Sequence, residues 1–111
     1  MEDLVAAMGR AIEQGDLLHY SAMNGRFHRA ICRAARHPTL ERALASLNFP
    51  LIRYQFRTVL APARPEVSLA EHREILAALL RRDACAARRA MRRHLSSVRA
   101  VVAGFADVLQ Y

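Results

Sequence analysis

Hydrophobic residues recur about every 3.6 positions along nearly the whole chain, which is the spacing of amphipathic helices. The first such segment covers residues 2–14, and Gly15 ends it because glycine readily adopts the left-handed conformation at a helix C-terminus. Asp16 is suited to cap a second helix, which runs to about residue 36, where His37-Pro38 stops it. We find no alternation typical of strands, so the pattern predicts an all-α fold.

The rest of the chain predicts further helices. A third helical region, interrupted by Pro50, precedes residues 61–67, which contain two prolines and indicate a loop. Ser68 is expected to open a fourth helix, because Ser68 and Glu71 fit the S-x-x-E capping box. Asp83 can cap a last helix that extends almost to the C-terminus. Short connections place successive helices side by side, so we expect an antiparallel bundle of about five helices.

Composition indicates one globular domain, residues 1–111. Hydrophobic residues make up 53% of the chain and aromatic residues 6%, which favours helices over sheets. No apolar run approaches the ~20 residues that a membrane helix needs. Acidic residues stand where a signal peptide carries positive charge, so Cys32 and Cys85 are interpreted as reduced thiols of a cytoplasmic protein.

The net charge is +7, and the chain contains arginine but no lysine. Six of these arginines gather around the start of the last predicted helix: Arg81, Arg82, Arg88, Arg89, Arg92 and Arg93. They have no aromatic residues between them, which favours a solvated face over a nucleic-acid surface. We therefore expect no sequence-specific DNA binding by this chain alone.

Three of the five histidines lie on mostly apolar helix faces: His28, His72 and His94. Residues three, four and seven positions away from each share its face. A buried imidazole must be hydrogen-bonded or bind a ligand. One such histidine is most simply a core residue satisfied by a neighbour. Three on different helices favour a shared polar cavity, and bundle interiors are where metal sites are built.

Three neutral imidazoles suit zinc or another divalent transition metal with open coordination positions. Asn24 lies one helical turn before His28, so its side-chain oxygen could reach the same ion. Cys32 also shares this face, but such a cysteine is more often a small buried hydrophobe. Glu71 and Glu74 are expected to point away from the histidine between them, which leaves a metal-dependent enzyme without a general base.

Three blocks of sequence each contain one of these histidines. Residues 24–31 are N-G-R-F-H-R-A-I, residues 68–76 are S-L-A-E-H-R-E-I-L, and residues 83–95 contain D-A-C-A-A followed by M-R-R-H-L. In order and spacing they resemble three segments of the FCD domain, the C-terminal effector domain of FadR-type GntR transcription regulators. The resemblance covers nearly the whole chain.

The resemblance implies a central cavity lined by one Asp and three His that hold a divalent metal. The three histidine ligands correspond to His28, His72 and His94, and the Asp position is occupied by Asn24. Asparagine keeps an oxygen donor but removes a negative charge, so we expect lower metal affinity or a changed metal preference. Zinc is favoured over nickel and manganese.

The resemblance also implies a small carboxylate effector bound beside the metal. Arg53 and Arg57 lie in the region where the family often has an arginine near the effector. Arginine can clamp a carboxylate through two parallel hydrogen bonds. A solvated arginine remains the alternative for each.

Two departures from the family set further expectations. The winged-helix DNA-binding domain and the first helix of the effector domain are not found in these 111 residues, so we expect an N-terminally truncated domain that reaches DNA only through a winged-helix domain. Phe105, Val108 and Leu109 would leave apolar surface exposed, which predicts a homodimer.

The sequence therefore predicts a ligand-sensing regulatory domain of a bacterial transcription regulator, not an enzyme. Two alternatives remain open at this point. One is a metal-dependent enzyme that uses the same histidines, and the other is a stand-alone helical oligomerisation module.

Overall fold

The computed structural model describes residues 1–39, 42–43 and 63–109. It contains the helices α1 (Glu2–Glu13), α2 (Leu17–Ala34), α4 (Arg64–Leu80) and α5 (Ala84–Leu109), and no strand is found in this part of the chain. The all-α prediction is confirmed. The described residues form four helices rather than about five, because most of the predicted third helical region lies outside them.

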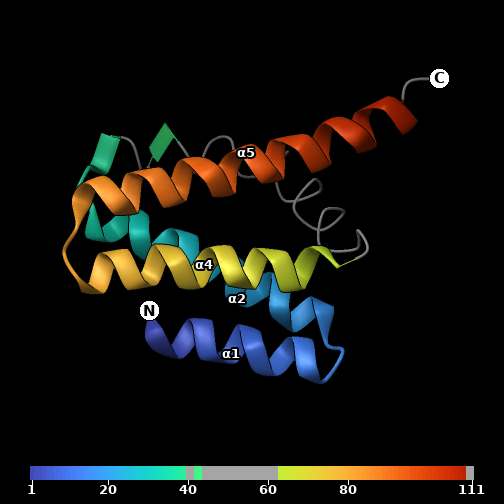
Figure 1. Ribbon diagram of the computed structural model, residues 1–111, viewed down its shortest axis with the longest axis horizontal. Helices are drawn as coiled ribbons and strands as arrows, with labels where there is room; N and C mark the ends of the chain where they lie inside the picture. Colours follow the sequence, from blue (N-terminus) through green and yellow to red (C-terminus); the bar gives the residue numbers. More distant parts are fainter. Residues whose placement is uncertain (40–41, 44–62, 110–111) are drawn as a thin grey trace.

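The four helices form two antiparallel hairpins (Figure 1). Helix α1 packs against α2, and α4 packs against α5. A further contact joins the hairpins, because α1 also packs against α4. In Figure 1, α1, α4 and α5 follow one another from bottom to top, and α2 passes behind α4. This arrangement surrounds α4 with the other helices.

Both hairpin turns use the cap residues that the sequence predicts. Gly15 has a φ of 69°, the left-handed conformation that glycine adopts without strain. The next residue, Asp16, accepts a hydrogen bond from the backbone N–H of His19 at 3.1 Å. Asp83 does the same for Ala86 at 3.0 Å. Each carboxylate thus satisfies one of the free N–H groups at the start of its helix.

The predicted start of α4 is wrong. The helix begins at Arg64, four residues before Ser68, so residues 64–67 belong to the helix and not to a loop. Pro65 is compatible with the first helical turn, where a backbone N–H has no partner within the helix. Ser68 is buried within the helix, so it is not a cap and the S-x-x-E motif is not a capping box here.

The apolar core lies chiefly between α1, α2 and α4. Its largest fully buried hydrophobic side chains are Tyr20, Phe27, Met8 and Ile75. The remaining core members are small or medium-sized side chains: Val5, Ala11, Met23, Leu69 and Ala90. These positions follow the helical periodicity of the sequence, so the core brings one face of each helix to the centre.

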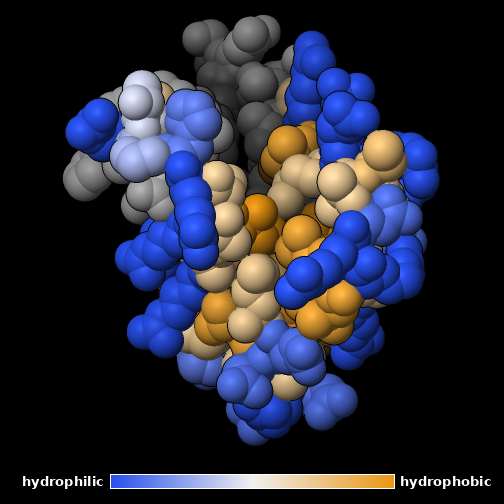
Figure 2. Space-filling model, turned by 90° about the vertical axis from the view of Figure 1, so that its left-hand side faces the viewer, coloured by the Kyte–Doolittle hydropathy of each residue, from blue (hydrophilic) through white to orange (hydrophobic). Residues whose placement is uncertain are grey.

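The surface around this core is strongly hydrophilic. Figure 2 shows the end of the bundle where α4 turns into α5, with hydrophobic residues gathered in the middle and hydrophilic residues around them. Leu80, at the end of α4, is 59% exposed. None of the helices in the described ranges is both long enough and apolar enough to cross a bilayer.

Candidate metal centre

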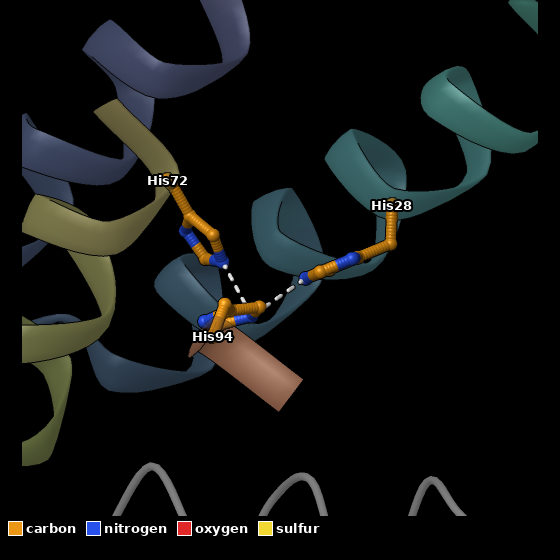
Figure 3. A group of neighbouring side chains, drawn as sticks. All are labelled: His28, His72 and His94. Carbon is orange, nitrogen blue, oxygen red and sulfur yellow. Dashed lines mark hydrogen bonds between the residues drawn. The ribbon is translucent and has the colours of Figure 1, made fainter. Parts of the chain in front are cut away.

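Three helices each contribute one imidazole to a single point in the bundle (Figure 3). His28 comes from α2, His72 from α4 and His94 from α5, and we call this group the histidine cluster. The Nε2 atom of His94 lies 3.3 Å from Nε2 of His72 and 3.3 Å from Nε2 of His28. His72 and His94 are almost completely buried, with 0% and 2% of their surfaces exposed. The sequence-predicted histidines are thus brought together.

The spacing of these nitrogens fits a metal ion. Zinc–nitrogen bonds of about 2.0–2.1 Å in a tetrahedral arrangement place ligand nitrogens roughly 3.3 Å apart. The two Nε2–Nε2 distances from His94 match this separation. All three potential ligand atoms lie within 4.8 Å of one another. The cluster can therefore supply three nitrogen ligands to one divalent ion.

Hydrogen bonding alone satisfies this arrangement poorly. A bare imidazole nitrogen has one lone pair in the ring plane, so Nε2 of His94 can accept one good hydrogen bond. It nevertheless faces two other Nε2 atoms. A cation removes the conflict, because it accepts the lone pairs of all three nitrogens at once.

The histidines are held in the neutral form that metals require. Burial and, to a smaller extent, the neighbouring His94 together lower the pKa of His28 from 6.5 to about 4. Burial is also the main cause that lowers the pKa of His72 and of His94. In His94 the hydrogen bond to Glu71 opposes this effect without reversing it. At neutral pH all three lone pairs are therefore available to a ligand.

Glu71 joins the cluster, although the sequence predicts that it points away. Its Oε1 atom lies 2.9 Å from Nδ1 of His94 and accepts a hydrogen bond from Arg64 at 2.9 Å. Burial raises the pKa of Glu71, but hydrogen bonds from Ser97 and His94 and the charge of Arg64 outweigh it, so the pKa is lowered overall. Glu71 is therefore an ionised partner of His94. Glu74 does point away, and it pairs at the surface with Arg93.

Asn24 carries a side-chain oxygen and lies on the same helix as His28. It lies one turn before His28 on α2, as the sequence predicts. Its Oδ1 atom is buried and has no hydrogen-bond partner in the described part of the chain. An unpartnered buried oxygen is costly unless it binds something, so Asn24 is compatible with a role as a further ligand.

The other candidate residues have different outcomes. Cys32 is half-buried and is not a member of the histidine cluster. Arg53 and Arg57 lie outside the described residues. Arg64, which the sequence analysis missed, is only 7% exposed and reaches Glu71 from the first position of α4. Its position in a predicted loop gave no signal of this role.

The fold and the histidine cluster define an all-helical domain with a candidate metal centre in its interior. A family model of the FCD domain matches residues 1–97, so the chain belongs to the FCD domain family. FCD domains are regulatory, effector-binding domains of GntR-family transcription regulators. No curated protein and no solved structure shows a significant match to the chain.

Proposed function

We propose that this domain senses a small organic acid through a divalent metal ion, zinc in preference to nickel or manganese, bound by His28, His72 and His94. The observation that carries the proposal is the convergence of three neutral imidazoles at metal–ligand spacing. Asn24 is the candidate for a fourth protein ligand. Such an ion would also resolve the hydrogen-bond conflict at Nε2 of His94.

The donor set favours an anionic effector. Three neutral imidazoles and a neutral amide leave the full charge of a divalent ion uncompensated, whereas an aspartate in place of Asn24 would cancel part of it. A cation with open positions attracts an oxygen anion, and carboxylates are common ligands of such ions. Arg53 and Arg57 are the proposed second contact for the carboxylate, because arginine binds this group in a bidentate manner.

The domain acts in this proposal as a switch and not as an enzyme. Effector binding would favour one helix arrangement over another, and a homodimer would pass this bias to a winged-helix DNA-binding domain. The Oε1 atom of Glu71 contacts both His94 and Arg64, which suits this carboxylate to orient His94. The cytoplasm is the proposed location.

Metal analysis of protein purified without a polyhistidine tag tests the central claim. We expect about one zinc, nickel or manganese ion per chain, or its uptake on titration. Calorimetric titration of the metal-loaded protein with small mono-, di- and tricarboxylates should then identify binding that the metal-free protein lacks. Protein that neither contains nor takes up such an ion would contradict the proposal.

Assembly and DNA binding are tested separately. Sedimentation at micromolar concentration should show a homodimer, and a clean monomer would contradict that part of the proposal. In mobility-shift titrations the chain should bind DNA weakly and lose it between low and physiological salt. A tight complex with one sequence at ~0.2 M salt would show that the DNA-binding role is misassigned.

A further inference from the structure

A chain of polar contacts connects the histidine cluster to the first residue of α4. Arg64 donates a hydrogen bond to Glu71 at 2.9 Å, and the same carboxylate oxygen lies 2.9 Å from Nδ1 of His94. The side chains of Arg64, Glu71 and His94 are 7%, 17% and 3% exposed. This degree of burial makes the contacts much stronger than those of a surface pair.

The chemistry of Glu71 fixes the proton on His94. An ionised carboxylate only accepts hydrogen bonds, so Nδ1 of His94 must carry the proton and donate it to Glu71. Neutral imidazole has only one ring proton, and Nε2 is therefore left with a bare lone pair. Nε2 is the atom that faces His28 and His72. The opposite tautomer would direct an N–H into the cluster and block a metal there.

We propose that Glu71, held in place by Arg64, is the positioning residue that sets the tautomer and orientation of His94 for metal binding. The metal-affinity part of this inference rests on the proposed function, whereas the tautomer part does not. A carboxylate behind a ligating histidine is a known way to orient the ring and raise its basicity. Arg64 donates a hydrogen bond to the same carboxylate oxygen, which holds Glu71 in place as an acceptor for His94.

A second glutamate on α4 supplies a matched control. Glu74 pairs with Arg93 at 3.3 Å, and both side chains are well exposed, at 61% and 67%. Each glutamate therefore binds one arginine, Glu71 that at the start of α4, Arg64, and Glu74 one of α5, Arg93. Both glutamates line the groove of about 520 Å³ between α4 and α5. Only Glu71 reaches a histidine of the cluster.

The first experiment uses metal-free protein and long-range ¹H–¹⁵N NMR spectra, which identify the protonated nitrogen of each imidazole. Wild-type His94 should carry its proton on Nδ1. The Glu71→Ala variant should lose this preference, Glu71→Gln should retain it because its amide oxygen still accepts, and Glu74→Ala should match the wild type. A wild-type His94 protonated on Nε2, or an unchanged Nδ1 proton in Glu71→Ala, would overturn the inference.

The second experiment measures zinc affinity of the same proteins by competition with a chelator. We expect Glu71→Ala to bind zinc roughly 10–100-fold more weakly, which is the usual effect of removing such a carboxylate. Glu71→Gln should lie between this variant and the wild type, and Glu74→Ala should remain within about twofold of the wild type. Equal affinities of Glu71→Ala and wild type would overturn the role in metal binding.

The two experiments separate failure of this inference from failure of the proposed function. If the wild type takes up no metal, the proposed function fails, and the tautomer spectra still decide what Glu71 does. If circular dichroism shows that Glu71→Ala does not fold, the NMR spectra of the wild type and of Glu71→Gln decide whether Glu71 sets the tautomer of His94. In that case the inference is refuted if His94 of the wild type carries its proton on Nε2 and Glu71→Gln binds zinc as tightly as the wild type.

Discussion

The interior of this domain has two regions that obey different rules. The apolar core between α1, α2 and α4 is filled by side chains such as Met8, Phe27 and Ile75. The histidine cluster between α2, α4 and α5 is filled by polar rings. The two regions are adjacent, because the ring centroids of Phe27 and His72 are 5.0 Å apart.

The regions differ in what burial does to the free energy of folding. Burying hydrocarbon is favourable, non-directional and tolerant of small shifts. Burying an imidazole opposes its protonation and requires a partner for each ring nitrogen. The Nδ1 atom of His72 is buried without a hydrogen-bond partner among the described residues, whereas that of His94 has Glu71. The core therefore stabilises the fold, and the cluster is a site whose stability depends on pH and ligands.

The largest expected effect tests the core. Phe27→Ala should lower the free energy of unfolding by about 3–5 kcal/mol, because it leaves a cavity where a ring with no exposed surface now packs. Urea unfolding of metal-free protein measures this loss. Leu18→Ala on the same helix is the control, because Leu18 is 69% exposed and should change stability by less than about 0.5 kcal/mol.

The next effect tests the cluster through pH. The unfolded chain binds a proton at His28 below its ordinary pKa of 6.5, whereas the folded metal-free protein does so only near pH 4. Stability should therefore be full above pH 6.5 and fall as the pH decreases to about 4, by up to roughly 3 kcal/mol from this residue.

Thermal melts of metal-free protein between pH 7 and 4 measure this dependence. His28→Ala should make the profile shallower but not flat, because His72 and His94 are also buried in the neutral form. The exposed residue His19 on the same helix provides a control, since His19→Ala should keep the wild-type profile. A profile that is equally steep in wild type and His28→Ala would place the acid sensitivity elsewhere.

A third effect distinguishes the cluster from the core by ligand binding. Zinc at about 100 times its dissociation constant should stabilise the wild type by about 2.7 kcal/mol, because it binds the folded state. His72→Ala should lose this increment, and a chelator should remove it from the wild type. Phe27→Ala should keep part of it, since Phe27 only packs beside the cluster. An identical zinc response in His72→Ala would contradict the metal site.

The smallest expected effects lie outside both regions, at the helix caps. Asp16→Ala and Asp83→Ala should each lower the free energy of unfolding by about 1 kcal/mol, because each removes a hydrogen bond to a helix N-terminus. Neither residue contacts the cluster, so the zinc-induced stabilisation should be unchanged. Denaturant unfolding with and without zinc checks both statements.

Prediction from the sequence works where one helix decides the outcome. The spacing of apolar residues identifies the buried faces and the three inward histidines, and local chemistry identifies the caps at Gly15, Asp16 and Asp83. These properties depend on residues within a few positions of one another.

Prediction fails where a contact joins different helices or where two local signals conflict. Glu71 is next to His72 in sequence, but its partner His94 lies on α5, and helix spacing within α4 cannot show this. The role of Arg64 cannot be predicted for the same reason, because its burial depends on the packing of α4. For the start of that helix, the S-x-x-E motif predicts Ser68, whereas Pro65 fits the first turn of a helix that begins earlier. The structure has the earlier start.

The two hairpins also have a consequence for the order of assembly. Each hairpin is built from contacts between neighbours along the chain, which form quickly and at little entropic cost. The contact between His28 and His94 spans 66 residues, whereas that between His72 and His94 spans 22. An ion shared by the three would act as a reversible crosslink between preformed halves. Unlike a disulfide, it would act only in the folded state, where the three helices meet, in a protein whose two cysteines are both free.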